Sequence, residues 1–141
     1  MDKKNYQKLM DEELNKPGSR DKTLLLQGCC APCSSFVLTS LKDRIKIKIL
    51  YYNPNIVDDG EYTMRLKELD RLVNTLNEEY PGSDIEFIEG RKEPERFLEI
   101  AKGLEQEPEG GARCVKCFEL RLRETAKVAK AEGADYFTTT L

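Results

Sequence analysis

Five cysteines in two clusters carry the most evident chemistry of this sequence. Cys29, Cys30 and Cys33 lie close together, and Cys114 and Cys117 follow much later in the chain. Cysteine thiolates bind zinc and iron–sulfur clusters and carry out disulfide exchange. An odd, clustered count without an export signal is not typical of a disulfide scaffold. The spacing therefore predicts a metal site or a redox dithiol.

Length and composition exclude several classes of protein. The chain has 141 residues, which indicates one domain, and it contains no histidine, which excludes an imidazole base and histidine-ligated metals. Its net charge of −3 argues against a general nucleic-acid coat but not against a local basic patch. No apolar run reaches the roughly 18 residues of a transmembrane helix, and the N-terminus is charged. We expect a cytoplasmic protein without membrane association.

The hydrophobic pattern switches repeatedly between that of a strand and that of a helix. Residues 1–21 predict an amphipathic leader helix that ends before Pro17 and Gly18, and residues 22–141 predict a single domain. We expect strands at 23–27, 45–52, 85–88 and 134–139. We expect helices at 34–42, with Pro32 in the first turn of that helix, and at 61–79, 94–102 and 114–132. This alternation predicts an α/β fold, with a parallel sheet of about four strands and helices on both faces.

This topology predicts where the two cysteine clusters lie. Ligands of open α/β sheets bind beyond the carboxyl ends of the strands, and Cys29 and Cys30 directly follow the first strand. Cys114 and Cys117 begin the last helix, which must run antiparallel to the last strand and so start at the same end. A helix N-terminus also lowers thiol pKa values. We expect the two clusters to converge there.

The pattern alone leaves several site chemistries open. A Cys₄ zinc site, an iron–sulfur cluster, a thioredoxin-like dithiol at Cys30 and Cys33, and simple buried cysteines all fit the spacing. The doublet of Cys29 and Cys30 argues against plain zinc, because adjacent cysteines rarely both bind one structural ion. The fifth thiol exceeds the four that a cluster needs and suggests a second or open metal position.

The last helix is strongly basic. Residues 113–130 contain six lysines and arginines against two glutamates. Lys116, Arg123, Lys127 and Lys130 share one face, and Phe118, Leu122, Ala126 and Ala129 share the opposite one. Both a solvated amphipathic helix and a stripe that contacts phosphates fit this pattern. Tyr51, Tyr52 and Tyr62 precede it and could stack on a base, although core packing is more typical of the first two.

Several sequence blocks occur in the order of one known family. They are LLLQGCCAPCSS (24–35), YYNPNI (51–56) followed by 61–65, the segment 103–111, RCVKC (113–117) with its continuation to 126, and FTTTL (137–141). Together they resemble the QueH family of epoxyqueuosine reductases. Gln27 stands where that family commonly has histidine. Family members usually continue past residue 141, so we expect a fragment, one half of a split protein or a shortened variant.

The resemblance implies a Rossmann-like fold and an iron–sulfur reductase. Its reaction would convert epoxyqueuosine to queuosine in tRNA by removing the epoxide oxygen. The resemblance implies a [4Fe–4S] cluster on Cys29, Cys30, Cys114 and Cys117. Cys33 would be catalytic and would help to hold an additional mononuclear iron.

The resemblance also implies partners and substrate contacts. The partners would be tRNA and an external electron donor, and the candidate contacts to substrate or phosphate are Tyr62, Arg65, Arg113 and Arg121. Two other hypotheses remain. One is a non-catalytic module that binds zinc or a cluster through cysteines, and the other is a dithiol oxidoreductase that uses Cys30 and Cys33.

Overall fold

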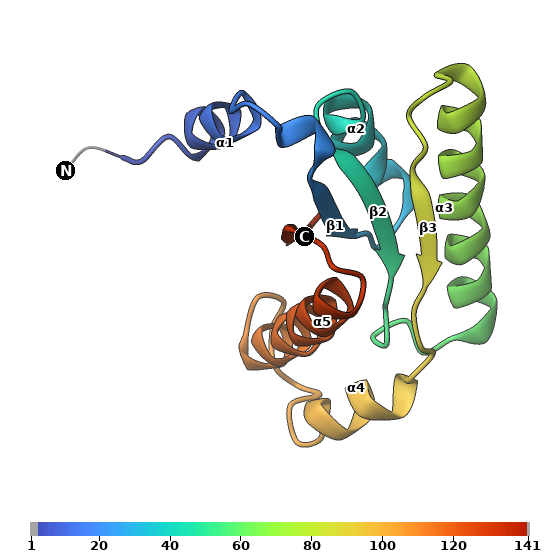
Figure 1. The fold of residues 1–141 in the computed structure, drawn as a ribbon. Helices are drawn as coiled ribbons and strands as arrows, with labels where there is room; N and C mark the ends of the chain where they lie inside the picture. The colour runs from blue at the N-terminus through green and yellow to red at the C-terminus, as the bar shows by residue number, and fades with distance from the viewer. Residues whose placement is uncertain (1–2, 141) are drawn as a thin grey trace.

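The computed structural model describes residues 3–140 and shows helices packed around one sheet (Figure 1). The elements are α1 (Tyr6–Leu14), a 3₁₀ turn (Ser19–Asp21), β1 (Thr23–Gln27), α2 (Ala31–Leu41), β2 (Lys46–Tyr51), α3 (Asp59–Glu79), β3 (Glu86–Glu89), α4 (Pro94–Ala101), α5 (Ala112–Ala131) and β4 (Tyr136–Thr139). Within the part of the chain so described, no helix is both long and apolar enough to cross a membrane.

The four strands form one parallel sheet in the order β3-β2-β1-β4. In register, Leu24 of β1 lies opposite Ile47 of β2 on one side and Tyr136 of β4 on the other. This order matches that of the first four strands of a dinucleotide-binding sheet, so the prediction of a Rossmann-like α/β fold is confirmed. The order reverses between β1 and β4, and that reversal opens a crevice at the carboxyl ends of these strands.

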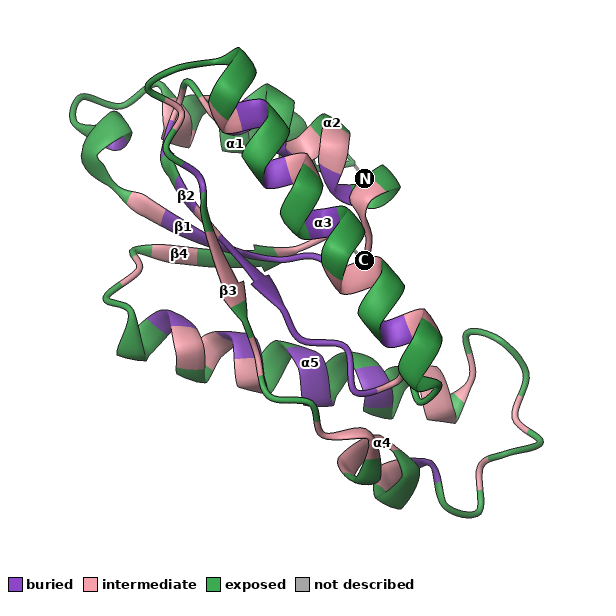
Figure 2. Ribbon diagram, turned by 90° about the vertical axis from the view of Figure 1, so that its right-hand side faces the viewer, coloured by how far each residue is buried: buried purple, intermediate pink, exposed green. Residues whose placement is uncertain are grey.

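Both faces of the sheet are covered (Figure 2). Successive side chains of a strand point to opposite faces, so the apolar run of β1 serves two cores. Leu26 packs with Leu38 of α2 and Leu69 of α3, whereas Leu25 packs with Leu120 of α5. The helix α4 packs against α5. The predicted arrangement with helices on both faces is therefore confirmed.

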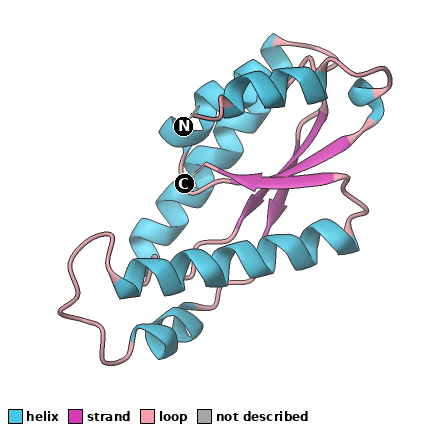
Figure 3. Cartoon of the chain, turned by 90° about the vertical axis from the view of Figure 1, so that its left-hand side faces the viewer, coloured by secondary structure: helices cyan, strands magenta, loops and turns pink. Residues whose placement is uncertain are grey.

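The helix α5 begins at the end of the sheet where the strands end (Figure 3). The Ala134 N–H, just after α5, bonds to the Ala129 carbonyl, and the Asp135 N–H bonds to the carbonyl of Thr23 at the start of β1. The C-terminus of α5 therefore lies at the amino end of β1. Because a 20-residue helix spans about 30 Å, its first turn lies at the opposite, carboxyl end.

Element boundaries differ from the predicted ones by a few residues. The helix α2 begins at Ala31 with Cys30 at the N-cap position, and the prediction that Pro32 lies in its first turn is confirmed. The strand β4 begins at Tyr136 rather than Ala134. The leader helix is confined to Tyr6–Leu14, and the 3₁₀ turn after it was not predicted.

The buried face of α5 differs from the face that its apolar residues mark. The helix buries Ala129 of the predicted apolar face, but its other buried residues are Cys117, Leu120, Arg121 and Thr125, and Phe118 is 42% exposed. Leu122 is also exposed. The reason is tertiary: Leu120 and Ala129 pack with Leu25 and Leu50 of the sheet, and Cys117 and Arg121 are buried on the same side of the helix. Helical periodicity alone does not encode that choice.

Candidate metal centre

Three cysteine sulfurs lie together at the crevice between β1 and β4. The group consists of Cys29, Cys30 and Cys33, whose sulfurs all lie within 4.8 Å of one another, and among the described residues it is the one group of this kind. The sulfurs of Cys29 and Cys30 are 3.8 Å apart. Cys29 Sγ also lies 4.0 Å from Thr140 Oγ1, directly after β4. The three thiols thus occupy the position where open α/β sheets bind ligands.

The sulfur spacing suits a metal ion. Two sulfurs bound at about 2.3 Å to one tetrahedral ion are about 3.8 Å apart. The Cys29 and Cys30 sulfurs already have this separation. Cys30 occupies the N-cap position of α2, and Cys33 lies in the first turn, where the helix dipole favours negative charge. The residues present therefore fit a thiolate-bound metal.

Ionisation within the three-thiol group favours Cys30 at the expense of Cys33. Burial raises the pKa of Cys30, but hydrogen bonds from the side chain and backbone of Cys33 outweigh it, and the pKa of Cys30 is lowered. The same hydrogen bond, followed by the charge of Cys29, raises the pKa of Cys33 to about 12. A bound cation is the simplest means of stabilising all three as thiolates.

A buried hydrogen-bond network holds the backbone beneath the three thiols. The Gln27 side-chain amide donates to the Tyr52 carbonyl over 3.0 Å and to Asn53 Oδ1 over 3.2 Å. Asn53 Nδ2 donates to the Gly28 carbonyl over 3.2 Å, and Thr139 Oγ1 donates to Gln27 Oε1 over 2.8 Å. The network ties together the ends of β1, β2 and β4. Sequence reasoning missed Asn53, although a polar residue directly after a buried apolar strand was a usable signal.

Gly28 allows α2 to approach the end of β1 closely. A Cβ at this position would lie 2.8 Å from Ser34 Oγ and 3.0 Å from Ile49 Cδ1. Ser34 is fully buried, and its hydroxyl has no hydrogen-bond partner. These contacts leave no room for a side chain at position 28. The backbone conformation does not itself require glycine, since Gly28 has no positive φ.

The second cysteine pair lies at the start of α5, at the same end of the sheet. Cys114 Sγ accepts a hydrogen bond from the Gly110 N–H over 3.3 Å. Cys117 is buried, and burial raises its pKa, opposed by the positive charge and hydrogen bond of Arg121. The topology therefore brings both clusters to one end, but Cys114 and Cys117 are not members of the three-sulfur group.

Buried polar atoms without partners surround this end of the sheet. They are Ser34 Oγ, Asn55 Oδ1, Tyr62 Oη and Arg121 Nε, from α2, the loop after β2, α3 and α5. Arg121 is only 5% exposed and has no ion pair among residues 3–140. Buried polar groups normally have partners, and a buried guanidinium needs a negative one. Of these atoms, the Arg121 Nε–H is a charged donor and fits a negatively charged group bound at this end, whereas Asn55 Oδ1 is an acceptor and needs a donor.

The four candidate substrate contacts have different environments. Tyr62 is 3% exposed and packs edge-on against Tyr51, with ring centroids 5.1 Å apart. Arg65 is partly exposed, pairs with Glu61 at 2.6 Å, and its charge helps to lower the pKa of Cys30. The other two candidates lie on α5, where Arg113 donates to a loop carbonyl over 3.3 Å and Arg121 is buried. The guanidinium groups of Arg65 and Arg113 are the more accessible.

Comparisons with known proteins identify relatives of one kind. The family model described as "Epoxyqueuosine reductase QueH" matches residues 24–141. The protein of that name from Staphylococcus epidermidis is 42% identical over 138 residues, which cover 94% of this chain and 57% of the relative. Its counterparts from Streptococcus pyogenes and Acinetobacter baylyi are 34% and 39% identical, over 97% and 92% of this chain and 54% and 56% of their own lengths.

The chain spans about half the length of the curated relatives that it matches. The match nevertheless includes both cysteine clusters, the Gln27 and Asn53 network and all of the sheet except Thr23. On this extent of similarity, the chain belongs to the epoxyqueuosine reductase QueH family.

Proposed function

We propose that this chain is the metal-binding part of an iron–sulfur reductase that converts epoxyqueuosine to queuosine in tRNA. The observation that carries the proposal is the group of three thiols at the carboxyl end of the sheet, in a chain whose relatives are named for this reaction. Loss of the epoxide oxygen as water consumes a pair of electrons and a pair of protons, so an external electron donor is required.

The cysteines divide into two roles in this proposal. Cys29, Cys30, Cys114 and Cys117 hold a [4Fe–4S] cluster, and Cys33 helps to hold an additional iron beside it. When bound, the cluster supplies electrons and the additional iron supplies a Lewis acid for the epoxide oxygen. The location of both clusters at one end of the sheet and the buried guanidinium beside Cys117 support this assignment.

The surrounding residues bind and orient the substrate. Arg65 and Arg113 are partly exposed cations suited to the phosphates or polar groups of a nucleotide. Tyr62 and Arg121 lie beneath the surface, and their unpartnered polar atoms complete the wall of the site. All four belong to elements that begin at the carboxyl end of the sheet.

A non-catalytic zinc module is the second candidate function. The 3.8 Å separation of the Cys29 and Cys30 sulfurs suits one tetrahedral ion, and zinc readily takes thiolate ligands. The two candidates differ in composition, because a zinc module contains no sulfide. The dithiol alternative at Cys30 and Cys33 requires no metal at all.

The test of the proposed function is conversion of the modified nucleoside. The chain is reconstituted with iron and sulfide without oxygen, then incubated with epoxyqueuosine-containing tRNA and dithionite. Nucleosides from digested tRNA are separated by liquid chromatography, and we expect the mass to fall by one oxygen atom. The zinc-loaded chain and the Cys33→Ala variant are the controls, and neither should produce queuosine. A chain with its full iron and sulfide content that leaves epoxyqueuosine unchanged would refute the proposal.

A further inference from the structure

The outer face of α5 concentrates positive charge on an otherwise acidic molecule. This helix carries six lysines and arginines against two glutamates, a net charge of +4, whereas the whole chain carries −3. The rest of the chain therefore has a net charge of −7. Four of the basic residues form a stripe along the exposed side of the helix, and we call Lys116, Arg123, Lys127 and Lys130 the basic stripe. A polyanion would be attracted to this face more than to any other part of the helix layers.

Helix stability does not explain the charge at the start of α5. The first turn contains no acidic residue, and Arg113 and Lys116 lie near it. The partial positive charge of a helix N-terminus favours Asp and Glu and disfavours cations. By contrast, α3 begins with Asp59 and Glu61, as helix electrostatics favour. The basic residues at this end of α5 therefore have an unfavourable intrahelical environment that an external anion would relieve.

Most of the basic stripe is not neutralised by the protein. Lys116, Lys127 and Lys130 form no ion pair with any residue between 3 and 140, and Arg123 pairs only with Glu119, at 2.9 Å. Basic residues of the other elements are commonly paired, as shown by Lys42, Arg44, Lys48, Arg65 and Arg96. Three of the four cations in the stripe thus have no counter-charge among residues 3–140, and the fourth is Arg123.

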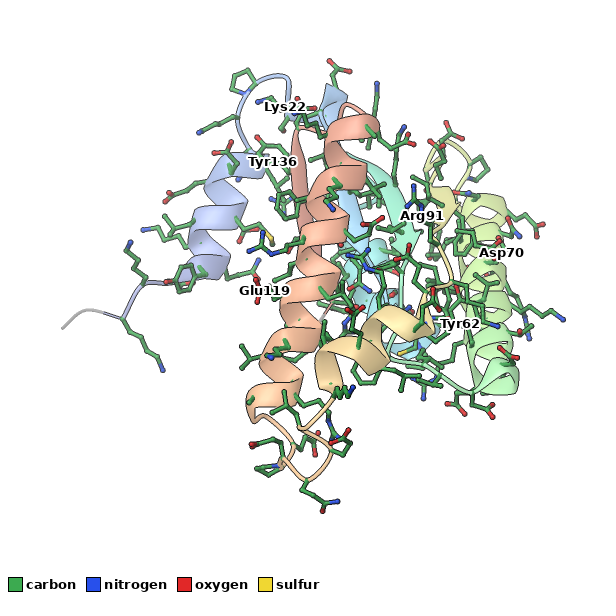
Figure 4. The ribbon with its side chains drawn as sticks, turned by 90° about the horizontal axis from the view of Figure 1, so that it is seen from below. Lys22, Tyr62, Asp70, Arg91, Glu119 and Tyr136 are labelled. Carbon is green, nitrogen blue, oxygen red and sulfur yellow. The ribbon has the colours of Figure 1, made fainter. Side chains whose placement is uncertain are left out.

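The basic stripe leads away from the metal centre. At 1.5 Å per residue, Lys116 and Lys130 are about 21 Å apart along the axis, and Lys116 is adjacent to Cys117. Figure 4 looks onto α5 from below and shows its outer face, with Glu119 labelled, open to the surroundings. A strand that followed the stripe would have one end beside the cysteines.

From these observations we infer that the basic stripe is the docking surface for the RNA backbone of the substrate. This inference rests on the proposed function, because the expected substrate is a tRNA. The cations contact phosphates, and they orient the RNA so that the modified nucleoside meets the metal centre at the N-terminal end of α5. Contacts of this kind supply affinity and register rather than sequence recognition.

The test is the salt-dependent binding of a fluorescein-labelled anticodon stem–loop RNA, followed by anisotropy. The quadruple variant K116Q/R123Q/K127Q/K130Q is compared with R20Q/K46Q/K67Q/R71Q, which removes the same charge from exposed positions on other elements. Each lost phosphate contact lowers the slope of log K against log salt by about 0.7 to 0.9. We expect the stripe variant to lose about three units of slope and at least tenfold in affinity, and the control variant to bind nearly as the wild type does.

Equal affinity and slope in the stripe variant and the wild type would overturn the inference, as would equal losses in the two quadruple variants. Conversion of epoxyqueuosine by the wild type distinguishes this failure from that of the proposed function. If the stripe variant converts epoxyqueuosine with an unchanged KM, the proposed function is supported and the proposed docking role of the basic stripe is refuted. If RNA binding depends on the basic stripe but the wild type does not convert epoxyqueuosine, the docking role is supported and the proposed function is refuted. Circular dichroism and iron content verify that each variant is folded and loaded.

Discussion

The side-chain amide of Gln27 donates a hydrogen bond to Asn53 Oδ1 over 3.2 Å, and both residues are fully buried. This contact joins the end of β1 to the residue pair that follows β2. Asn53 in turn donates to the carbonyl of Gly28, directly before the three-thiol group. The position of the three-thiol group therefore depends on a side-chain network that includes none of its cysteines.

Asn53→Ala should weaken the support beneath the cysteines. It leaves the Gly28 carbonyl and part of the Gln27 amide buried without partners, which costs about 1–3 kcal/mol per group. We expect a lower unfolding midpoint in urea, followed by circular dichroism, and less iron bound per chain. Asn74→Ala, at an exposed position of α3, is the matched control. Equal midpoints for the two variants would show that the network does not support the loop.

Gly28→Ala should be destabilising because its methyl group would lie 2.8 Å from Ser34 Oγ and 3.0 Å from Ile49 Cδ1. Overpacking of this kind costs about 1–3 kcal/mol. Ser34→Ala alone should have little effect on stability, because the Ser34 hydroxyl has no hydrogen-bond partner. The double variant should recover part of the loss, and a double-mutant cycle from urea unfolding measures that coupling. Strict additivity would contradict the proposed steric contact.

Glu93 should make the fold sensitive to acid. Burial opposes its ionisation, but hydrogen bonds from Arg96 at 3.0 Å and Tyr52 at 2.9 Å outweigh burial and lower its pKa below the ordinary 4.5. A group with a lowered folded-state pKa stabilises the fold above its unfolded pKa, and this contribution is lost as the pH falls through the folded value.

Glu93→Gln should therefore cost about 1–3 kcal/mol at pH 7 and progressively less below pH 4.5. Urea unfolding of the wild type and the variant between pH 3 and 7 measures this difference. Glu95→Gln, at an exposed position of α4, is the control and should shift neither curve. A pH-independent difference between Glu93→Gln and the wild type would mean that the ionised carboxylate is not the stabilising form.

The periodicity of the sequence predicted the elements and their arrangement well. The apolar run of β1 indicated a strand buried on both faces, and the alternation of strands and helices indicated a parallel sheet. The topology implied by this alternation also located both cysteine clusters at one end of the sheet. These features are local or follow from chirality and connection rules, so a single sequence contains enough information for them.

Side-chain contacts between distant segments were not predictable in the same way. The partnership of Gln27 with Asn53 depends on the pairing register of β1 and β2, and Ser34 approaches Gly28 only because of how α2 docks. The rotation of α5, which buries Arg121 and exposes Phe118, is also set by tertiary contacts. The close group formed by Cys29, Cys30 and Cys33 was signalled by their spacing, whereas its separation from the second pair was not.

Substitution of single cysteines should separate the two proposed metal positions. Cys114→Ala or Cys117→Ala removes a cluster ligand, so each should lose most of its bound iron. Cys33→Ala should retain the cluster and lose the additional iron together with activity. Iron and sulfide analysis of the three variants measures this difference. Unchanged iron in both α5 variants, or loss of the entire cluster from Cys33→Ala, would contradict the assigned roles.

The central claim is that the five cysteines hold an iron–sulfur cluster and an additional iron. The most direct measurement is the iron, sulfide and zinc content of protein purified without oxygen, with its visible absorption spectrum. The proposal predicts about five irons and about four sulfides per chain, with the broad absorption of a cluster. About one zinc and no sulfide, persisting after anaerobic reconstitution with iron and sulfide, would contradict it and favour the structural zinc module.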